Sequence, residues 1–419
     1  MRERGRRQMF QAYGPGSGTH VEVKGSDSSV RNGRKRFGCV IRTRRTRTDK
    51  HSNQNGENME KHSGVFERFV QLENLYGGYL LARRNKRFRP EVLSYSAHLE
   101  ENLIDAQNHL IWQDLVVKGI HSFYEYFPKV RLIHALPFKY RVMNCAAYNV
   151  LWPIYSRSFY EHSYGSIPGR GQVRACDQLQ QWLRWSRNKP EKWYIGKMDI
   201  QKFFFRIPIE VQIRELMKPL DDVKMLWYLE TMIRSDGRPF GMPLEYSDPF
   251  DVDMVPGIGM QVGSLISQMT ANVVLTPVDH YIKRVLKAPK YIRYMDDMRI
   301  LTPSKQQSWD IIGRANEYLQ NDFGLQLNHK TAVIPAEHGC EYIGKIVTAD
   351  KIHIRKDCSL RMKKHLDYVR RAYAEGEVPL EYAISVIQSY LGLLSHTSDD
   401  ALRERICQDF VLVRKSAPD

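Results

Sequence analysis

Cysteine is scarce in this sequence, and the cysteines that are present do not lie in closely spaced pairs. The 419 residues include 6 cysteines, and none is part of a CxxC motif. Zinc sites and redox centres are usually built on such closely spaced pairs, and small secreted domains on a regular cysteine framework. The scattered spacing therefore argues against a zinc site or a disulfide framework, and it is typical of a reducing cytoplasm.

Long apolar runs are also missing. No stretch of about 18 apolar residues is available to span a membrane. No charged segment followed by an apolar one opens the chain, as a secretory leader would. We therefore expect a cytoplasmic protein with no membrane partner.

Acidic residues are outnumbered by basic ones. Lysine and arginine total 63 against 47 aspartate and glutamate residues, which gives a net charge of +16 at pH 7. Such an excess favours a polyanionic partner, and nucleic acid is the first candidate. With 42% hydrophobic residues the chain can build a sizeable core, and its length allows roughly two to three domains.

The beginning of the chain differs from the rest. Residues 1–58 are rich in Gly, Ser, Asn and Arg and show little apolar periodicity. This composition predicts a disordered basic arm that binds phosphates without specificity. An interpretation of equal weight is that translation begins at Met59 and that the arm is not part of the native protein.

Apolar residues at spacings of three and four dominate two parts of the remaining chain. This periodicity predicts four helices, at 66–87, 94–115, 361–376 and 380–396. Gly376 and Pro379 mark a turn between the last two helices.

An acidic pair interrupts an apolar segment in YIRYMDDMRIL, residues 291–301. The runs on either side have strand character, so Asp296 and Asp297 are predicted to form a two-residue hairpin connection. No Gly or Asn eases this turn, and adjacent carboxylates repel each other. Acidic pairs are common in solvated turns. A divalent cation would nevertheless neutralise the repulsion, and Mg²⁺ prefers a few carboxylates together with substrate phosphates.

A third acid extends this interpretation. Asp199 ends the apolar run of WYIGKMDIQKFFFRIP, residues 193–208, just before an aromatic cluster. An Asp after a strand is often a helix cap or a turn former. Together with Asp296 and Asp297, however, it would form a two-strand carboxylate cluster of the kind that holds two metal ions for in-line phosphoryl transfer.

These motifs resemble the palm of reverse transcriptases, which are RNA-directed DNA polymerases. Asp199 with the following FFF, and YMDD at 294–297, match two palm motifs, and residues 257–286 resemble a third. FGLQLNHKTAVIP and CEYIGKIV resemble the next two motifs, while KVRLI, LPFKYRV and SYGSIPGRGQVRA resemble the finger motifs of bacterial members. The similarity covers roughly residues 64–400, with all motifs in the expected order.

The resemblance implies an α+β fold, a right-hand polymerase with fingers, an antiparallel-sheet palm and a short helical thumb. It divides the chain into the arm at 1–58, a helical N-terminal region with the fingers at 59–180, the palm at 181–350 and the thumb at 351–419. The implied partners are an RNA template, a DNA or RNA primer, the RNA–DNA hybrid and dNTPs. In the thumb, the cations Arg361, Lys363 and Lys364 would track the hybrid backbone.

The resemblance also assigns roles to individual residues. The metal site, for two Mg²⁺ ions with Mn²⁺ as a substitute, would comprise Asp199, Ile200, Asp296 and Asp297. The catalytic set is Asp199, Asp296, Asp297 and Lys330, with Lys330 as a proton donor to the leaving group. Substrate contacts are expected from Lys129, Arg131, Arg141, Phe204, Val262, Gly263 and Gln268. The turn at Tyr342, Ile343 and Gly344 would support the primer end.

Some of these roles have simple alternatives. The ring of Phe204 would clash with a 2′-hydroxyl and favour deoxynucleotides, which is the preferred interpretation; core packing beside Phe203 and Phe205 is the alternative. The cations Lys129, Arg131 and Arg141 would grip the triphosphate, although lone surface cations are usually solvated. Lys330 could simply be a lysine at a helix end.

Two departures from the family pattern bear on the subclass. Many members have Gln-Gly and then Ser-Pro in the third palm motif, whereas this sequence has Val262-Gly263 and Ser267-Gln268, which resembles the enzymes of diversity-generating retroelements. Val262 cannot check the template by hydrogen bonding, so error-prone copying with misincorporation opposite adenine is a hypothesis. Such an element would also use a small basic accessory protein. Tyr140 precedes Arg141 where relatives commonly have Asp, which puts that finger contact in doubt.

Other settings remain open. A retron, a group II-like enzyme or a phage-defence reverse transcriptase would carry the same core motifs. A non-catalytic RNA-binding relative would keep the fold without the activity. Intact Asp199, Asp296 and Asp297 argue against that alternative, because buried acids without a metal would be costly.

Overall fold

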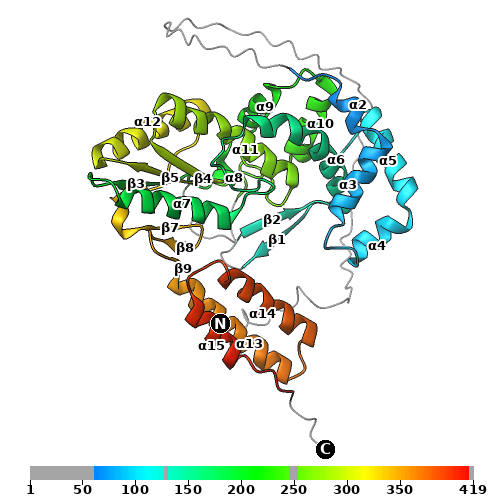
Figure 1. The fold of residues 1–419 in the computed structure, drawn as a ribbon. Helices are drawn as coiled ribbons and strands as arrows, with labels where there is room; N and C mark the ends of the chain where they lie inside the picture. Colours follow the sequence, from blue (N-terminus) through cyan, green and yellow to red (C-terminus); the bar gives the residue numbers. More distant parts are fainter. Residues whose placement is uncertain (1–60, 127–130, 245–252, 415–419) are drawn as a thin grey trace, which may run out of the picture. The chain divides into compact units, whose positions relative to one another are not determined.

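The computed structural model describes residues 61–126, 131–244 and 253–414 (Figure 1). The predicted arm at 1–58 and Met59 lie outside the described residues, as do Lys129 and the last five residues of the predicted thumb. Within the described part of the chain, no helix is both long and apolar enough to cross a membrane.

Short helices form the N-terminal region. The two long helices predicted here are each broken in two: α2 (Val65–Phe69) and α3 (Leu72–Ala82), then α4 (Pro90–Ala97) and α5 (Leu99–Ile111). The breaks lie at Gln71 and His98, where the backbone leaves the helical region. Apolar periodicity continues across both breaks, so it did not reveal them.

The helix α6 (Phe138–Tyr155) organises this region. α3 packs along it closely, because a Cβ on Gly78 would lie only 2.6 Å from the backbone oxygen of Val142. A two-stranded antiparallel hairpin, β1 (His121–Glu125) and β2 (Arg131–Ala135), precedes α6. The chain therefore runs from this hairpin directly into the long helix α6.

A four-stranded antiparallel sheet lies in the middle of the chain. Its order is β4 (Lys290–Tyr294), β5 (Asp297–Thr302), β3 (Tyr194–Asp199) and β6 (Ala332–Pro335). Side chains alternate between its two faces. Met198 and Ile300 pack with the helices α11 (Leu265–His280) and α12 (Lys305–Phe323), while Ile195 packs with α7 (Gln172–Arg187) on the other face.

Shorter elements connect these parts. They are the helices α8 (Phe203–Arg206), α9 (Ile209–Met217) and α10 (Val223–Arg234), the 3₁₀ turns η2 (Ser156–Ser158), η3 (Ser235–Gly237) and η5 (Ala336–His338), and the π-helical turn η4 (Tyr281–Val285).

A three-stranded antiparallel sheet and three helices end the described chain. The strands are β7 (Cys340–Tyr342), β8 (Lys345–Val347) and β9 (Ile352–Ile354), and the helices are α13 (Lys356–Ala374), α14 (Leu380–Leu394) and α15 (Asp400–Asp409). The two predicted C-terminal helices are confirmed as α13 and α14, and Figure 1 shows the three helices in one group. Together, helices and antiparallel sheets confirm the expected α+β class.

Candidate active site

The turn that joins β4 to β5 differs by one residue from the prediction. Tyr294 pairs with Asp297, so the two loop residues are Met295 and Asp296 rather than Asp296 and Asp297. Met295 takes a positive φ of 54°, which two-residue hairpin turns require and which Gly or Asn adopts at lower cost. Asp297 is consequently the first residue of β5. The two acids therefore have different backbone environments.

The backbone brings the three aspartates together. Asp199, the last residue of β3, is the register partner of Asp297 on β5. The N–H of Ile200 donates to the carbonyl oxygen of Asp296 at 3.3 Å. Both carboxylate-bearing strands therefore end at the same edge of the sheet, next to the turn.

The electrostatics of Asp296 reflect this convergence. Burial, and then the charge of Asp199, raise the pKa of the Asp296 carboxyl to about 7, and Asp297 adds to the shift. Arg131, at the start of β2, acts in the opposite direction on the same pKa. Negative charge thus accumulates at this edge, and a predicted substrate-binding cation lies close enough to oppose it.

Side chains of the protein engage the carboxylates of Asp297 and Asp199. Asp297 forms an ion pair with the buried Arg299, which also donates to the carbonyl oxygen of Glu341 at 2.7 Å. Asp199 accepts a hydrogen bond from the side chain of Asn328, whose backbone N–H donates to the Asp199 carbonyl oxygen at 2.8 Å.

This arrangement differs from the predicted three-carboxylate cluster. Among the described residues, no group of three or more His, Cys, Asp or Glu side chains is placed to hold a metal ion. Asp199 and Asp296 fit a hard divalent cation by chemistry, since both offer oxygen donors and a cation would offset the burial and the charge of Asp199 that raise the pKa of Asp296. Asp297 engages Arg299 through one carboxylate oxygen, Oδ1.

Sequence reasoning missed Asn328 and Arg299. Asn328 lies in the loop between α12 and β6. An antiparallel β-bridge between Ile200 and Leu327 brings this loop next to Asp199. No local pattern marks this pairing. Arg299 could have been found, because it lies two residues after Asp297 on a strand and so shares its face of the sheet.

Phe204 lies on the short helix α8 beside this edge. Its side chain is half-buried and packs against the core between the sheet and α11. Its carbonyl oxygen accepts the N–H of Met260 at 2.7 Å, which links α8 to the segment that leads to Val262.

The segment at Val262 and Gly263 contacts the β1–β2 hairpin. The N–H of His134 donates to the Val262 carbonyl oxygen at 3.2 Å, and the side chain of Gln261 donates to the His134 carbonyl oxygen at 3.1 Å. Gly263 has a φ of 111°, which L side chains rarely adopt. Gln268 is half-buried in the first turns of α11.

The remaining predicted contacts differ in their surroundings. Arg131 is exposed, whereas Arg141 forms an ion pair with Glu91 at 2.5 Å and lies over the ring of Phe138. To contact a triphosphate, Arg141 would therefore have to release Glu91. Lys330 is exposed in the loop after α12, away from the helix end, and its N–H donates to the Asn328 side chain at 2.8 Å.

The predicted primer-supporting turn joins β7 to β8. Tyr342 pairs with Lys345, so Ile343 and Gly344 form a two-residue loop with φ values of 51° and 73°. Two positive φ values are typical of a type I′ hairpin turn. The buried ring of Tyr342 lies under the guanidinium of Arg299, with the guanidinium carbon 5.0 Å from the ring centroid. The turn is thereby connected to the ion pair at Asp297.

The solved structures similar to this chain include two telomerases of low sequence identity. Apo telomerase from Candida tropicalis, truncated from its C-terminal domain, is 12% identical over 62% of this chain and 60% of its own length, with a TM-score of 0.40. Telomerase from Candida albicans in complex with a TWJ fragment of telomeric RNA is 14% identical over 68% and 54%, with a TM-score of 0.38. The chain thus spans less than two thirds of either structure.

Sequence comparisons give a clearer result. No curated protein sequence matches the chain. The profile of the family described as reverse transcriptase (RNA-dependent DNA polymerase) matches residues 127–347, which is more than half of the chain and includes every aspartate of the candidate site. The chain therefore belongs to the reverse transcriptase (RNA-dependent DNA polymerase) family.

Proposed function

We propose that this chain is an RNA-directed DNA polymerase that adds dNTPs to a primer on an RNA template. The observation that carries the proposal is the meeting of Asp199 and Asp296 at one edge of the sheet, where burial and the charge of Asp199 raise the pKa of Asp296 to about 7. Family membership and the excess of basic residues support the same substrate class.

In this proposal Asp199 and Asp296 hold the metal, with Asp297 and the backbone of Ile200 as further ligands. A bound pair of Mg²⁺ ions, or of Mn²⁺ ions, supplies stabilisation of the attacking and leaving oxygens in phosphoryl transfer. Arg299 and Asn328 keep the carboxylates of Asp297 and Asp199 ordered before the metal binds.

Cations of the chain act on the nucleotide in this proposal. Arg131, exposed and close enough to lower the pKa of Asp296, offsets charge on the triphosphate, and Lys129 and Arg141 assist. Lys330 donates a proton to the leaving group, and the turn around Ile343 supports the primer end.

We further propose the division of the described chain into fingers, palm and thumb at the boundaries given above. The exposed cations of α13 then follow the backbone of an RNA–DNA hybrid. We also propose a finer subclass: an error-prone enzyme of a diversity-generating retroelement, which works with a small basic accessory protein. This proposal is based on the presence of Val262 and Gln268 in the third palm motif. A retron, group II-like or phage-defence enzyme is the alternative.

The test is primer extension on a defined RNA template with dNTPs and Mg²⁺, followed by sequencing of the products. We expect extension that stops on chelation of the metal and errors concentrated opposite template adenines. Binding of the hybrid without extension would identify a non-catalytic relative and contradict the proposal. Extension with faithful copying at adenine would contradict only the error-prone subclass.

A further inference from the structure

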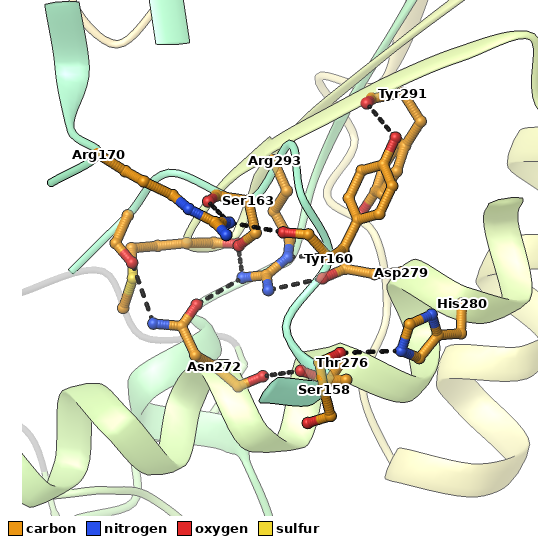
Figure 2. A network of polar contacts seen from close by, with 12 residues as sticks. Ser158, Tyr160, Ser163, Arg170, Asn272, Thr276, Asp279, His280, Tyr291 and Arg293 are labelled. Atoms are coloured by element: carbon orange, nitrogen blue, oxygen red, sulfur yellow. Dashed lines mark hydrogen bonds and ion pairs between the residues drawn. The ribbon is translucent and has the colours of Figure 1, made fainter. Parts of the chain in front are cut away.

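A buried ion pair lies directly behind the turn that carries Asp296. Arg293 on β4 and Asp279 on α11 are both fully buried, and the guanidinium forms two hydrogen bonds to the carboxylate, each 2.7 Å long. Figure 2 shows this pair at the centre of a polar network in which Tyr291 also takes part. The Tyr291 hydroxyl donates to the same carboxylate at 2.7 Å.

The third nitrogen of the guanidinium, Nη1, points to the turn. It donates to the carbonyl oxygen of Met295 at 3.1 Å and to the side-chain oxygen of Asn272 at 3.2 Å. The Met295 carbonyl belongs to the peptide bond that leads into Asp296. Arg293 therefore fixes the backbone of the turn from within the core.

A loop on the other side restrains the same turn. The Asn272 amide donates to the Gly165 carbonyl oxygen at 3.0 Å. Gly165 in turn touches Met295, because a Cβ at that glycine would lie 2.5 Å from the Met295 side chain. The N–H of Tyr164 donates to the carbonyl oxygen of Arg293 at 2.9 Å. The turn is thus held between α11, β4 and this loop.

Stability alone does not account for a buried charge pair in this place. Replacing such pairs by apolar residues of similar volume is often neutral or stabilising, since removing two charges from water is costly. What an apolar pair would lack is direction. The fork of Arg293 sets four acceptor atoms of three residues at fixed angles, and one of these atoms is the backbone oxygen beside Asp296.

We propose that Arg293, Asp279 and Asn272 form a positioning network that holds the Met295–Asp296 turn in the conformation that presents the Asp296 carboxylate to a divalent metal. The inference rests on the proposed function in so far as Asp296 is taken as a metal ligand. None of the three residues needs to touch metal, primer or nucleotide. The positive φ of Met295 is a conformation that must be held, because the side chain alone disfavours it.

Two variants test the part of the network that reaches the turn. Arg293→Lys keeps the charge beside Asp279 but cannot donate to all four acceptor atoms, and Asn272→Ala removes the hydrogen bond to Gly165 without introducing or removing a charge. Tyr291→Phe is the matched control, since it removes one hydrogen bond from the same buried carboxylate and none from the turn itself. If Arg293→Lys does not fold, Asn272→Ala carries the comparison.

The readout is Mn²⁺ binding to the folded full chain, measured by electron paramagnetic resonance without nucleic acid, together with the thermal midpoint. We expect Arg293→Lys and Asn272→Ala to weaken Mn²⁺ binding at least fivefold, and Tyr291→Phe to stay within twofold of the parent even where its midpoint falls equally. Equal Mn²⁺ affinity in all variants would overturn the proposal, as would an equal loss in Tyr291→Phe. The measurement needs no polymerisation, so a failure of the proposed activity remains distinguishable.

Discussion

Phe204 is fixed through its backbone, while its ring remains half-exposed. The ring meets that of Phe203 edge-on, with centroids 5.3 Å apart, and no more than part of its surface is in the core. Under the proposed function the exposed part lies where a 2′-hydroxyl would collide with it. A half-buried ring can both pack in the core and present its exposed part to a sugar.

Phe204→Ala should relax sugar selection. Removing the ring is expected to raise kcat/KM for ribonucleotides relative to dNTPs by at least about tenfold, because steric exclusion in a pocket is worth roughly that much. Single-nucleotide incorporation measures the ratio. Phe205→Ala, at the half-buried neighbour, should leave it unchanged. An unchanged ratio in Phe204→Ala would mean that the ring serves packing alone.

His134 makes the fold sensitive to acid. Burial, and then the nearby charge of Arg238, lower the pKa of its imidazole to about 4, while Nδ1 contacts the Ser122 hydroxyl at 2.9 Å. In the unfolded chain the same group has a pKa of about 6.5. Protons therefore bind the unfolded chain first. The stability contribution of neutral His134 is present above pH 6.5 and is lost as the pH falls toward 4.

Denaturant unfolding should reveal this loss. Between about pH 6.5 and pH 4 we expect the parent to lose up to about 1.4 kcal/mol of unfolding free energy per pH unit more than His134→Gln, which cannot be protonated. Comparison with the variant cancels the other titrating groups. Parallel pH profiles for the two proteins would contradict the burial of a neutral imidazole at the β2–Val262 contact.

At the scale of elements, the turn between β4 and β5 depends on a close approach. A Cβ at Gly165 would lie 2.6 Å from the backbone nitrogen of Met295, so that backbone or loop would have to move. Gly165→Ala should therefore lower the unfolding free energy by about 1–3 kcal/mol, as overpacking does. Gly313→Ala is the control, because nothing lies within 4 Å of a Cβ at this exposed helical position.

The two substitutions should change the unfolding free energy in opposite directions. Alanine is a better helix former than glycine, so Gly313→Ala in α12 is expected to raise the unfolding free energy by about 0.5–1 kcal/mol. Urea titration of both variants gives the comparison. If Gly165→Ala were as stable as the parent, the loop at Gly165 would not be packed against the turn.

Elements with a strong local pattern could be predicted from the sequence. The strands around the acidic pair and the helices α13 and α14 follow from alternation and from apolar periodicity. The exact register of the turn did not follow, because Met295 has no preference for the positive φ that it adopts. The breaks at Gln71 and His98 were missed because neither residue is a recognised helix breaker.

The candidate site could be predicted in part. The three aspartates were found from their spacing and resemblance, and the register that joins Asp199 to Asp297 agrees with the expectation of neighbouring strands. The partners Asn328 and Arg299 depend on which loops and strands meet, which a local pattern does not encode. The engagement of Arg141 by Glu91 is likewise a contact between distant segments.

At the scale of the whole molecule, several features agree on one class of activity. The excess positive charge favours a nucleic acid partner, the family profile covers residues 127–347, and the acids of the proposed metal site lie within it. The central claim is that this chain polymerises dNTPs on RNA and that Asp296 is essential for the chemistry. Both parts can be tested in one experiment on the full chain.

That experiment is single-turnover incorporation of one dNTP on an RNA template with Mg²⁺, comparing the parent with Asp296→Asn and Asp310→Asn. Asp310 is an exposed acid on α12, so its variant controls for the loss of one negative charge. We predict that Asp296→Asn lowers the rate at least about 100-fold, since even outer-shell changes at metal sites cost roughly 10–100-fold, and that Asp310→Asn matches the parent. Equal rates for the parent and Asp296→Asn would contradict the account.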